Sequence, residues 1–537
     1  MWDQFIVLDV ETSSLDFLTG KIICLGIKVN GEGPKVIFKQ IPKDIINILE
    51  SPEYLKIGHN ISFDIKFLRN SGVNIVGPYF DTKIAYFQYH PFEPLGLKDI
   101  LSKMGWKIKR FQDVIGKGKN KKKLEEVDQE VLSRYCKQDV LGSYEIYNRY
   151  KNKISSWTEF IEFPLIDLII NMESRGLFLD QKQIRKLEKI FIERIVDLEL
   201  KFPGINLRSP LQVRNFLISR GYSKDLSRYV ANTEVISTGR LVLKSLSNTV
   251  PICKDILQHR EFSKLISTYI LKMKDKNILT GSFNQCGTRS GRISSSSPNL
   301  QNIPIRTEYG KMIRKCIISR PGYKFILGDL SQIEPRLISF FSQDSKLLEI
   351  FNSGKDFHTE VTQEIFNKRE VTKDERFIGK TVGLATLYGA GVDTLFDVLV
   401  GYGVEISKIR VREIRETIIQ AFPRISYWSS NEIYKVNKIG YIDTLGGRRI
   451  VLPKKYINII NYKIQGSAAD IMKLILLNLY FLGYSVLASV HDEVVVEVKE
   501  SEEYKKEEVK NIMERSFSLK DTPIVADVKV ANSWGDK

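Results

Sequence analysis

Residues 5–12 of the chain read FIVLDVET, and this stretch combines a strand-forming pattern with two carboxylates. The apolar, β-branched run at 5–10 and a second run at 22–29, IICLGIKV, predict neighbouring buried strands. Because side chains alternate between the two faces of a strand, Asp9 and Glu11 point the same way. Two carboxylates held side by side repel each other unless a cation lies between them. The stretch therefore predicts a sheet that carries a cation-binding site.

Helical patterns follow these strands and bring further carboxylates. Asp64 opens one such pattern, directly after the sequence NISF at 60–63. Tyr135 and Asp139 are four residues apart on another, so they share one helix face. A single aspartate in such a position is most often a helix cap or a surface charge, but the whole set is able to converge. With the two strands, three helical segments predict an α/β domain that ends near residue 150: 43–50, 62–70 and 128–150.

The order DxE, NxxFD and YxxxD resembles that of the DEDD-type 3′–5′ exonucleases, in the subgroup with a tyrosine in the last motif. The resemblance implies a ribonuclease H-like α/β domain over residues 1–152. It also implies that Tyr135 orients the attacking water. The four carboxylates that it assigns to a pair of Mg²⁺ ions, for which Mn²⁺ is a substitute, are Asp9, Glu11, Asp64 and Asp139.

Composition narrows the class of protein. At 537 residues the chain is too long for a single core, and its formal net charge of +17 favours a polyanionic partner. Charge alone does not separate nucleic-acid binding from mere solubility. The five cysteines are scattered, so a disulfide framework or a zinc ribbon is not expected. No signal peptide is visible, and the most apolar stretch, Ile471–Val490, contains Lys473 and a Gly-Tyr break, so we expect a cytoplasmic protein without a membrane span.

A second set of carboxylates lies towards the C-terminus. Asp329 follows the apolar run FILG in a predicted strand at 323–330, and Asp492-Glu493 lie at a predicted hairpin turn in SVHDEVVVEV. A charged pair between two buried strands is costly unless it binds a metal or lies exposed at a sheet rim. An ordinary polar hairpin turn is the alternative for this pair.

A stripe of four residues on the predicted helix at 373–388 makes the ordinary hairpin turn a weaker alternative for Asp492-Glu493. Arg376, Lys380, Leu384 and Tyr388 are each four residues apart. Two cations suit phosphates, and an apolar residue and an aromatic ring suit a sugar and a base. Taken alone, such a stripe is more often an ordinary amphipathic surface.

Six segments in one order resemble the motifs of family A DNA polymerases: TRSGRISSSSPNLQNIP, DLSQIEPR, RFIGKTVGLATLYG, TLGGRRIVLP, IQGSAADIMK and VHDE. Sequence motifs make the likeness strong over residues 280–537. Over residues 155–280 the likeness rests on position in the chain and not on motifs. With the exonuclease it resembles the Klenow-type unit of two activities. It implies an α+β polymerase domain of right-hand architecture over 153–537. Its parts are a thumb at about 175–285, a palm at about 286–345 and 440–537, and fingers at about 346–439.

The resemblance also implies roles at the site of nucleotide addition. Asp329 and Asp492 hold two Mg²⁺ ions, and Glu493 is an accessory carboxylate. Lys380 contacts the incoming triphosphate and donates a proton to the leaving pyrophosphate, and Glu334 lies under the sugar and blocks a 2′-hydroxyl. Further nucleotide contacts are Arg376, His358, Leu384 and Tyr388; DNA contacts are Arg292, Arg314, Asn461, Gln465 and His491.

Some positions depart from the family pattern. Leu330 and Leu384 stand where relatives usually have aromatic residues, which leaves packing near the primer and dideoxynucleotide acceptance open. Only eight residues precede Asp9, so we expect no 5′-nuclease domain and a compact, phage-like enzyme. We expect a monomer that binds primer-template DNA and dNTPs. The alternatives are a nuclease whose C-terminal half only grips DNA, and a structural replication factor.

Overall fold

The computed structural model describes residues 3–116, 121–222, 237–247, 249–305, 307–453 and 458–536. The chain divides into two compact units, each of which is described by itself. Unit 1 comprises Met1–Arg175, Ser282–Ser295 and Lys435–Val494, and unit 2 comprises Gly176–Gly281, Ser296–Tyr434 and Val495–Lys537.

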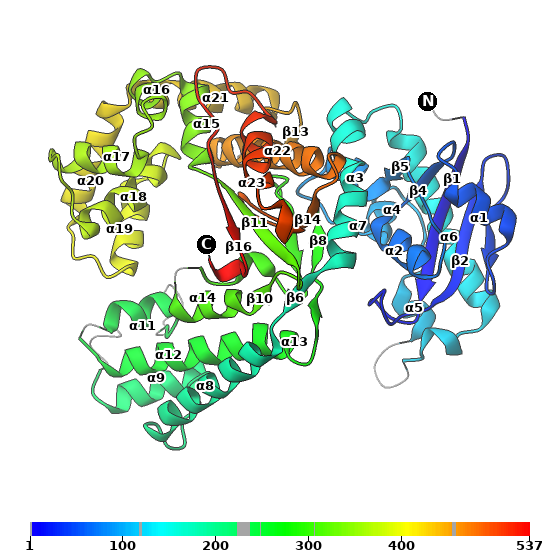
Figure 1. Cartoon of the computed structure of the whole chain (residues 1–537), viewed down its shortest axis with the longest axis horizontal. Coiled ribbons are helices and arrows are strands. Elements are labelled where there is room, and N and C mark those ends of the chain that lie inside the picture. The colour runs from blue at the N-terminus through cyan, green and yellow to red at the C-terminus, as the bar shows by residue number, and fades with distance from the viewer. Residues whose placement is uncertain are drawn as a thin grey trace. The chain divides into compact units, whose positions relative to one another are not determined.

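The N-terminal part of unit 1 is an α/β fold. Its elements are β1 (Phe5–Thr12), β2 (Ile22–Val29), β3 (Lys35–Ile37), α1 (Lys43–Glu50), β4 (Leu55–Gly58), α2 (Ser62–Asn70), β5 (Tyr79–Asp81), α3 (Thr82–Phe87), α4 (Leu97–Lys103), α5 (Phe111–Ile115), η2 (Leu124–Glu126) and α6 (Gln129–Tyr150). The strands form one sheet in the order β3-β2-β1-β4-β5, drawn in blue tones in Figure 1. β2 runs antiparallel to β1, and β4 runs parallel to it. The predicted neighbouring strands at 5–10 and 22–29 are therefore confirmed.

The long helix α6 packs across β1 and β2. Gly26, which pairs with Asp9 in the sheet, allows this close approach. A Cβ atom added to Gly26 would lie 2.5 Å from Sγ of Cys136 and 2.8 Å from Cγ2 of Val140, both of which are on α6. The missing side chain thus lets the helix lie close to β2, next to the strand β1 that carries the carboxylates.

Unit 1 also contains segments from later in the chain. These elements are η3 (Thr158–Glu162, a π-helix), α7 (Leu165–Arg175), β8 (Ser282–Asn284), β9 (Ser294–Ser296, whose last residue begins unit 2), β12 (Tyr441–Asp443), β13 (Arg449–Val451), α22 (Ile459–Phe481) and β14 (Ser485–Val490). A buried ion pair joins η3 to α22, with Nζ of Lys473 2.6 Å from Oε1 of Glu162. The same carboxylate accepts hydrogen bonds from the Trp157 indole and the Gln285 amide.

Unit 2 is mostly helical. Its elements are β6 (Leu177–Leu179), α8 (Gln181–Leu200), α9 (Pro210–Ser219), α11 (Arg240–Leu246), α12 (Ile252–Leu265), η4 (Ile266–Ile270), α13 (Leu271–Met273), β7 (Ile278–Leu279), η5 (Leu300–Asn302), α14 (Glu308–Lys315), β10 (Ile317–Ile318), β11 (Tyr323–Leu330), α15 (Ile333–Ser342), α16 (Ser345–Asn352), α17 (Phe357–Phe366), α18 (Lys373–Leu387), α19 (Val392–Gly401), α20 (Lys408–Ala421), α21 (Pro423–Ile439), β15 (Glu493–Lys499), η6 (Glu500–Glu502), α23 (Lys505–Arg515), β16 (Ala526–Ala531) and η7 (Trp534–Asp536). The end of α21 and the start of β15 belong to unit 1.

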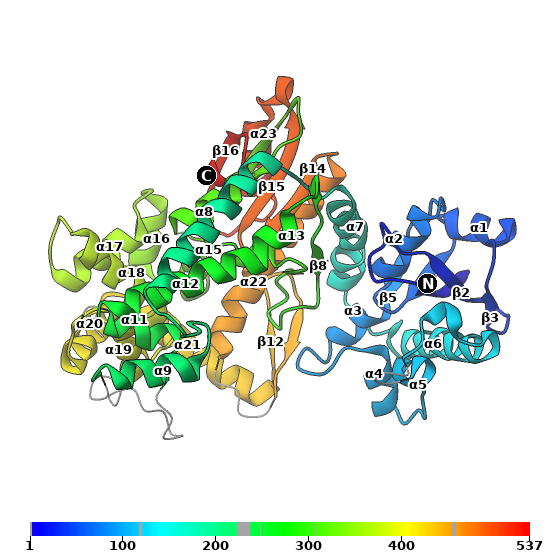
Figure 2. The ribbon, with the colours of Figure 1, turned by 90° about the horizontal axis from the view of Figure 1, so that it is seen from below.

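Three groups of elements organise unit 2. Helices α8 and α12 lie side by side in Figures 1 and 2. Helices α17, α18 and α20 pack against one another as a second group. The third group contains β11 and β16, which pair antiparallel with Asp329 opposite Asp527.

The elements predicted at 5–10, 22–29, 43–50, 62–70, 128–150, 323–330 and 373–388 begin and end within two residues of the observed ones. Helix α20 ends before Pro423, which begins α21, and the residue between them, Phe422, leaves the helical conformation with φ −130°. Helix α22 begins at Ile459, and Ile460 and Ile464 lie on its buried face.

The close packing at Gly26 gives a testable prediction. Gly26→Ala forces the new methyl group into the side chains of α6, so we expect a loss of about 1–3 kcal/mol of unfolding free energy, as for other overpacked sites. Denaturant unfolding followed by circular dichroism measures this loss. Gly33→Ala is the matched control, because a Cβ there meets no described atom within 4 Å. Equal stability of the two variants would contradict the packing argument.

Candidate active sites

The first predicted carboxylate set forms a cluster in unit 1. Asp9 and Glu11 lie on β1, and Asp139 lies on the face of α6 that covers this strand. One carboxylate oxygen from each residue lies within 4.8 Å of the others. The alternation of β1 and the register of α6 thus bring together residues that are far apart in the sequence, as the strand and helix patterns predict.

Asp64 lies beside this cluster, in the first turn of α2. Its Oδ1 accepts a hydrogen bond of 2.8 Å from the backbone N–H of Val10, the residue between Asp9 and Glu11. Burial and the nearby Asp9 carboxylate raise the pKa of Asp64 well above its ordinary value. The hydrogen bond therefore ties α2 to the strand and holds a fourth carboxylate near Asp9.

The raised pKa values of Asp9 and Glu11 indicate that the cluster lacks sufficient positive charge. Burial raises the pKa of Asp9 to about 6. Burial, followed by the Asp9 carboxylate and Cys24, raises the pKa of Glu11 to about 9. Each shift reports that the ionised form is costly without a neighbouring positive charge. An all-oxygen set whose negative charge a nearby lysine offsets only in part fits a hard divalent cation.

Tyr135 lies one helical turn before Asp139 and is buried. Burial, and then the charges of Glu11 and Asp9, raise the pKa of its hydroxyl, which therefore stays protonated. A protonated phenol is able to donate a hydrogen bond in this acidic surrounding. The charges of the cluster thus act on Tyr135, the residue that is predicted to orient the water.

Lys98, on α4, is a residue of this site that the sequence patterns missed. Its ammonium forms an ion pair with Asp139 and lies 4.3 Å from the ring centroid of Tyr135. Burial lowers its pKa to about 8, against the opposing pull of Asp9 and Glu11. The only sequence signal is indirect, because a converging set of carboxylates requires some cation.

The second carboxylate set is divided between the units. Asp329 is half-buried on β11 in unit 2. Asp492 and Glu493 belong to unit 1, where Asp492 forms an ion pair of 3.4 Å with Arg292 and Glu493 is 2% exposed. The convergence of Asp329 and Asp492 on one pair of ions stays a prediction.

Three predicted DNA contacts lie near the surface of unit 1. His491 is exposed in the turn before β15 and has a positive φ of 57°. Asn461 and Gln465 are half-buried and one turn apart on α22. Their spacing gives the helix one polar edge along its first two turns.

In unit 2, the structure brings Glu334 and Tyr388 together. Glu334 lies in the first turn of α15, and Tyr388 follows the last turn of α18. The Tyr388 hydroxyl donates a hydrogen bond to Oε2 of Glu334. The predicted sugar-blocking residue and the predicted base-stacking residue therefore form one polar contact between two helices.

The remaining stripe on α18 is accessible. Arg376 and Lys380 are exposed, and Leu384 is half-buried. Arg376 forms an ion pair of 2.9 Å with Asp356, the residue that caps α17. Burial opposes ionisation of Asp356, but hydrogen bonds from Thr359 and Arg376 outweigh it and lower the pKa to about 2.

His358, the second residue of α17, lies next to this ion pair. Burial, and then the positive charge of Lys380, lower its pKa to about 4, so the imidazole is neutral at pH 7. It would meet a phosphate as a neutral hydrogen-bond donor rather than as a cation.

Comparison with known proteins identifies both halves of the chain. The sequence profile of DNA polymerase family A matches residues 180–536, and the profile of a 3′-5′ exonuclease domain matches residues 4–155. The chain belongs to DNA polymerase family A. The two matches confirm the predicted resemblances to both families.

The family A relatives include DNA polymerase I of Borreliella burgdorferi, which is 31% identical over 99% of this chain and 62% of that protein. DNA polymerase I of Chloroflexus aurantiacus is 30% identical over 90% of this chain and 55% of that protein. The chain thus spans less than two thirds of the length of these relatives.

A solved structure has the same fold. It is the POL domain of Pol1 from M. smegmatis in complex with DNA primer-template and dNTP, with a TM-score of 0.86 and 24% identity. The match covers 99% of this chain and 96% of that chain. It confirms the predicted fold class, an α/β exonuclease domain followed by an α+β polymerase domain. Of the helices in the described part of the chain, none has the length and apolar character needed to cross a membrane.

Arg314 differs in kind from the other predicted DNA contacts of this family A chain. It is 2% exposed on α14, and its guanidinium lies 4.2 Å from the ring centroid of Trp534. Its described environment is therefore the interior of unit 2, and contact with DNA stays a prediction.

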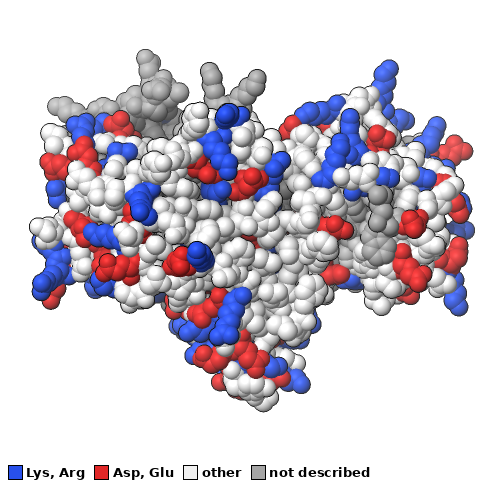
Figure 3. All heavy atoms as spheres, turned by 90° about the horizontal axis from the view of Figure 1, so that it is seen from above, with Lys and Arg blue, Asp and Glu red and all other residues white. Residues whose placement is uncertain are grey.

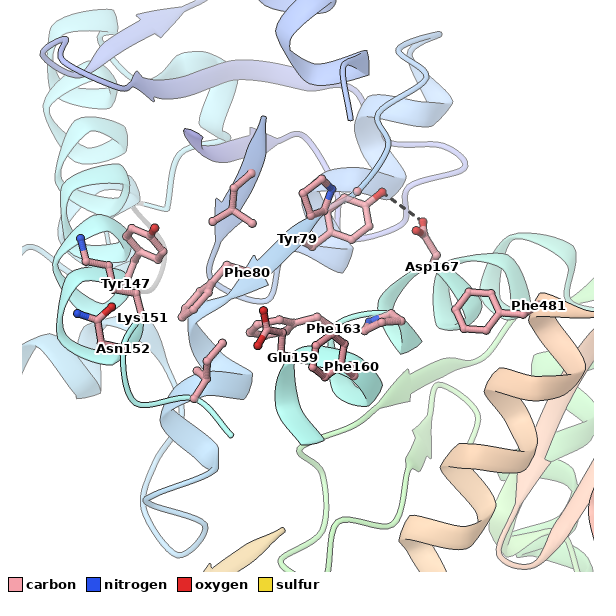
Figure 4. A pocket seen from close by; sticks show the side chains of 15 residues that line it. Tyr79, Phe80, Tyr147, Lys151, Asn152, Glu159, Phe160, Phe163, Asp167 and Phe481 are labelled. Atoms are coloured by element: carbon pink, nitrogen blue, oxygen red, sulfur yellow. Dashed lines mark hydrogen bonds between the residues drawn. The ribbon is translucent and has the colours of Figure 1, made fainter. Parts of the chain in front are cut away.

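A cavity of about 750 Å³ lies in unit 1 beside β5 and η3. Figure 4 shows aromatic side chains around it, among them Phe80, Tyr147 and Phe163, together with the hydrogen bond from Tyr79 to Asp167. Among the described residues that line it, none is a predicted site residue.

On the face shown in Figure 3, basic and acidic side chains of the described residues are interspersed.

The raised pKa values predict that metal binding at the Asp9 cluster releases protons. Glu11, with a pKa of about 9, is protonated at pH 7 and must ionise to ligate, so the apparent Mn²⁺ affinity should rise from pH 6 to pH 9. Calorimetry in two buffers of different ionisation enthalpy measures the released protons.

The control is the double variant Asp9→Asn with Glu11→Gln, which should lose this proton release and leave only that of other sites. A pH-independent affinity in the unsubstituted chain would show that the carboxylates are already ionised.

Proposed function

We propose that this chain is a template-directed DNA polymerase that extends a primer 3′ end with dNTPs and proofreads it with a 3′–5′ exonuclease. The observation that carries the proposal is the pair of profile matches, each of which contains a full set of the predicted carboxylates. In this proposal the exonuclease domain is residues 1–152 and the polymerase domain is 153–537. Primer-template DNA and dNTPs are the partners of a cytoplasmic monomer.

Mg²⁺ is the proposed cofactor, with Mn²⁺ as a substitute. Asp9, Glu11, Asp64 and Asp139 would hold one pair of ions, and Asp329 and Asp492 the other. Bound ions supply Lewis acidity, which stabilises negative charge on the oxygens of a phosphate under attack. The fit rests on the oxygen-only donors and on the raised carboxylate pKa values at the first site.

In the hydrolytic reaction, the Tyr135 hydroxyl holds the attacking water. Its protonated state at neutral pH supports this role, because it leaves the phenol a donor to the water oxygen. The buried position of Tyr135 on α6 keeps its distance from Asp139 constant, since both are on one rigid helix. The water attacks the last phosphodiester and releases a mononucleotide.

In the synthetic reaction, α18 binds the nucleotide. Arg376 and Lys380 contact the triphosphate, and Lys380 protonates the leaving pyrophosphate. Their exposure on one helix face supports this role. His358 adds a neutral contact, and Leu384 packs against the sugar.

The Glu334–Tyr388 contact selects the sugar. A carboxylate fixed by a tyrosine hydroxyl occupies the space that a 2′-hydroxyl would need. Arg292, Asn461, Gln465 and His491 contact primer and template in this proposal, as does Arg314 if its helix rearranges on DNA. Glu493 supports the carboxylate of its neighbour Asp492.

The proposal predicts that the two activities separate. Asp329→Asn should reduce primer extension by about 10³-fold or more, because it removes a metal-holding carboxylate worth several kcal/mol in the transition state. The same variant should degrade single-stranded DNA normally. A primer-extension gel with and without dNTPs measures both activities.

The reciprocal variant, Asp9→Ala with Glu11→Ala, should extend primers and fail to degrade DNA. Loss of both activities in either folded variant would contradict the two-site proposal. A chain that degrades DNA but never extends a primer would instead support the alternative of a nuclease with a DNA-gripping half.

The sugar-selection role predicts that Glu334→Ala raises ribonucleotide incorporation relative to deoxynucleotide incorporation by about tenfold or more, an effect of at least about 1.4 kcal/mol. Tyr388→Phe should give a smaller change in the same direction, because it releases the carboxylate without removing it. Single-nucleotide incorporation kinetics give the ratio. Glu405→Ala, at an exposed position, is the control, and an unchanged ratio in Glu334→Ala refutes the assignment.

A further inference from the structure

Lys98 is buried among the carboxylates that would hold metal. Its side chain is 14% exposed and that of Asp139 is 7% exposed, and the two form an ion pair. The charges of Asp9 and Glu11 also act on the ammonium. A lysine that is paired with one carboxylate of a proposed metal-binding cluster carries the same sign of charge as the metal, so the binding of one affects the binding of the other.

The packing of its helix and a contact with an aromatic ring hold Lys98 in place. Its helix, α4, packs on α6, the helix that carries both Asp139 and Tyr135. The ammonium lies 4.3 Å from the ring centroid of Tyr135, which is a favourable cation–π distance. The ring therefore offers the ammonium a contact that does not involve a carboxylate.

We propose that Lys98 is a displaceable counter-cation that competes with divalent metal for Asp139 and so sets the metal concentration at which the exonuclease site fills. Without metal, the ammonium offsets part of the repulsion between the carboxylates and keeps the site folded. When metal binds, the ammonium leaves Asp139 and is retained by the Tyr135 ring. This inference rests on the proposed exonuclease function, because it assigns metal to these carboxylates.

The test measures metal binding directly, without requiring activity. Lys98→Met keeps the apolar stem and removes the charge. Mn²⁺ is titrated by calorimetry into the full chain in an Asp329→Asn background, which weakens the other predicted metal set. We expect Lys98→Met to bind Mn²⁺ at least about tenfold more tightly than the parent, because a unit charge near the ion is removed.

Two further variants show whether charge is the cause. Lys98→Arg keeps the charge and should stay within about threefold of the parent affinity. Lys103→Met lies on the same helix but at an exposed position, and it should leave Mn²⁺ binding unchanged. Thermal unfolding of each variant without metal confirms that it is folded.

Unchanged or weaker Mn²⁺ binding in folded Lys98→Met would overturn the proposal, and so would equal tightening in Lys98→Met and Lys98→Arg, which would indicate a steric cause. In the chain with Asp329 intact, Lys98→Met should also lower the Mg²⁺ concentration for half-maximal DNA degradation. If the parent chain degrades no DNA, the proposed function fails, while the calorimetric result still decides the role of Lys98.

Discussion

Burial of carboxyl groups is the constraint on which the N-terminal α/β fold of this molecule depends. Asp9 and Glu11 share one face of β1, and α6 places a carboxylate oxygen of Asp139 within 4.8 Å of theirs, near the point where Gly26 lets the helix approach. This arrangement opposes stability by itself, because a folded chain without metal either ionises these groups in a poorly solvated place or, as for Glu11 at pH 7, keeps them protonated. The sheet and the two helices that carry these groups must be rigid enough to maintain this arrangement until a cation relieves it.

Unit 1 also contains a buried carboxylate, that of Glu162, whose negative charge is compensated by its neighbours. Glu162 is 5% exposed, whereas Asp9 and Glu11 are half-buried, and Lys473, Trp157 and Gln285 all donate hydrogen bonds to it. Burial raises its pKa, but the charges of Lys473 and Arg448 together with the hydrogen bonds from Lys473 and Trp157 outweigh burial, and the net shift is downward. No hydrogen bond of this kind reaches Glu11, whose pKa is about 9, from the described residues. The contrast separates a carboxylate that is compensated within the fold from one that the proposed function assigns to a metal.

Local sequence patterns predicted much of this arrangement, and the features that they missed have a physical explanation. The alternation of β1, the helix that carries Tyr135 and Asp139, and the exposed stripe on α18 follow from periodicity, which depends only on neighbouring residues. Periodicity says nothing about which side chains meet across distant elements. The ion pair of Lys98 with Asp139 and the burial of Arg314 against Trp534 are such meetings.

The cations of the two sites differ in how firmly they are held. Arg376 and Asp356 have side chains that are 45% and 36% exposed, so their ion pair contributes little net stability and an incoming triphosphate can exchange it at low cost. Arg292 and Asp492 are 20% and 25% exposed, and Lys98 and Asp139 only 14% and 7%. Breaking a pair as dry as the last leaves a buried charge uncompensated unless another cation replaces it at once. In the proposed function a nucleotide would therefore be able to capture Arg376 by itself, whereas Lys98 would leave Asp139 only in exchange for metal.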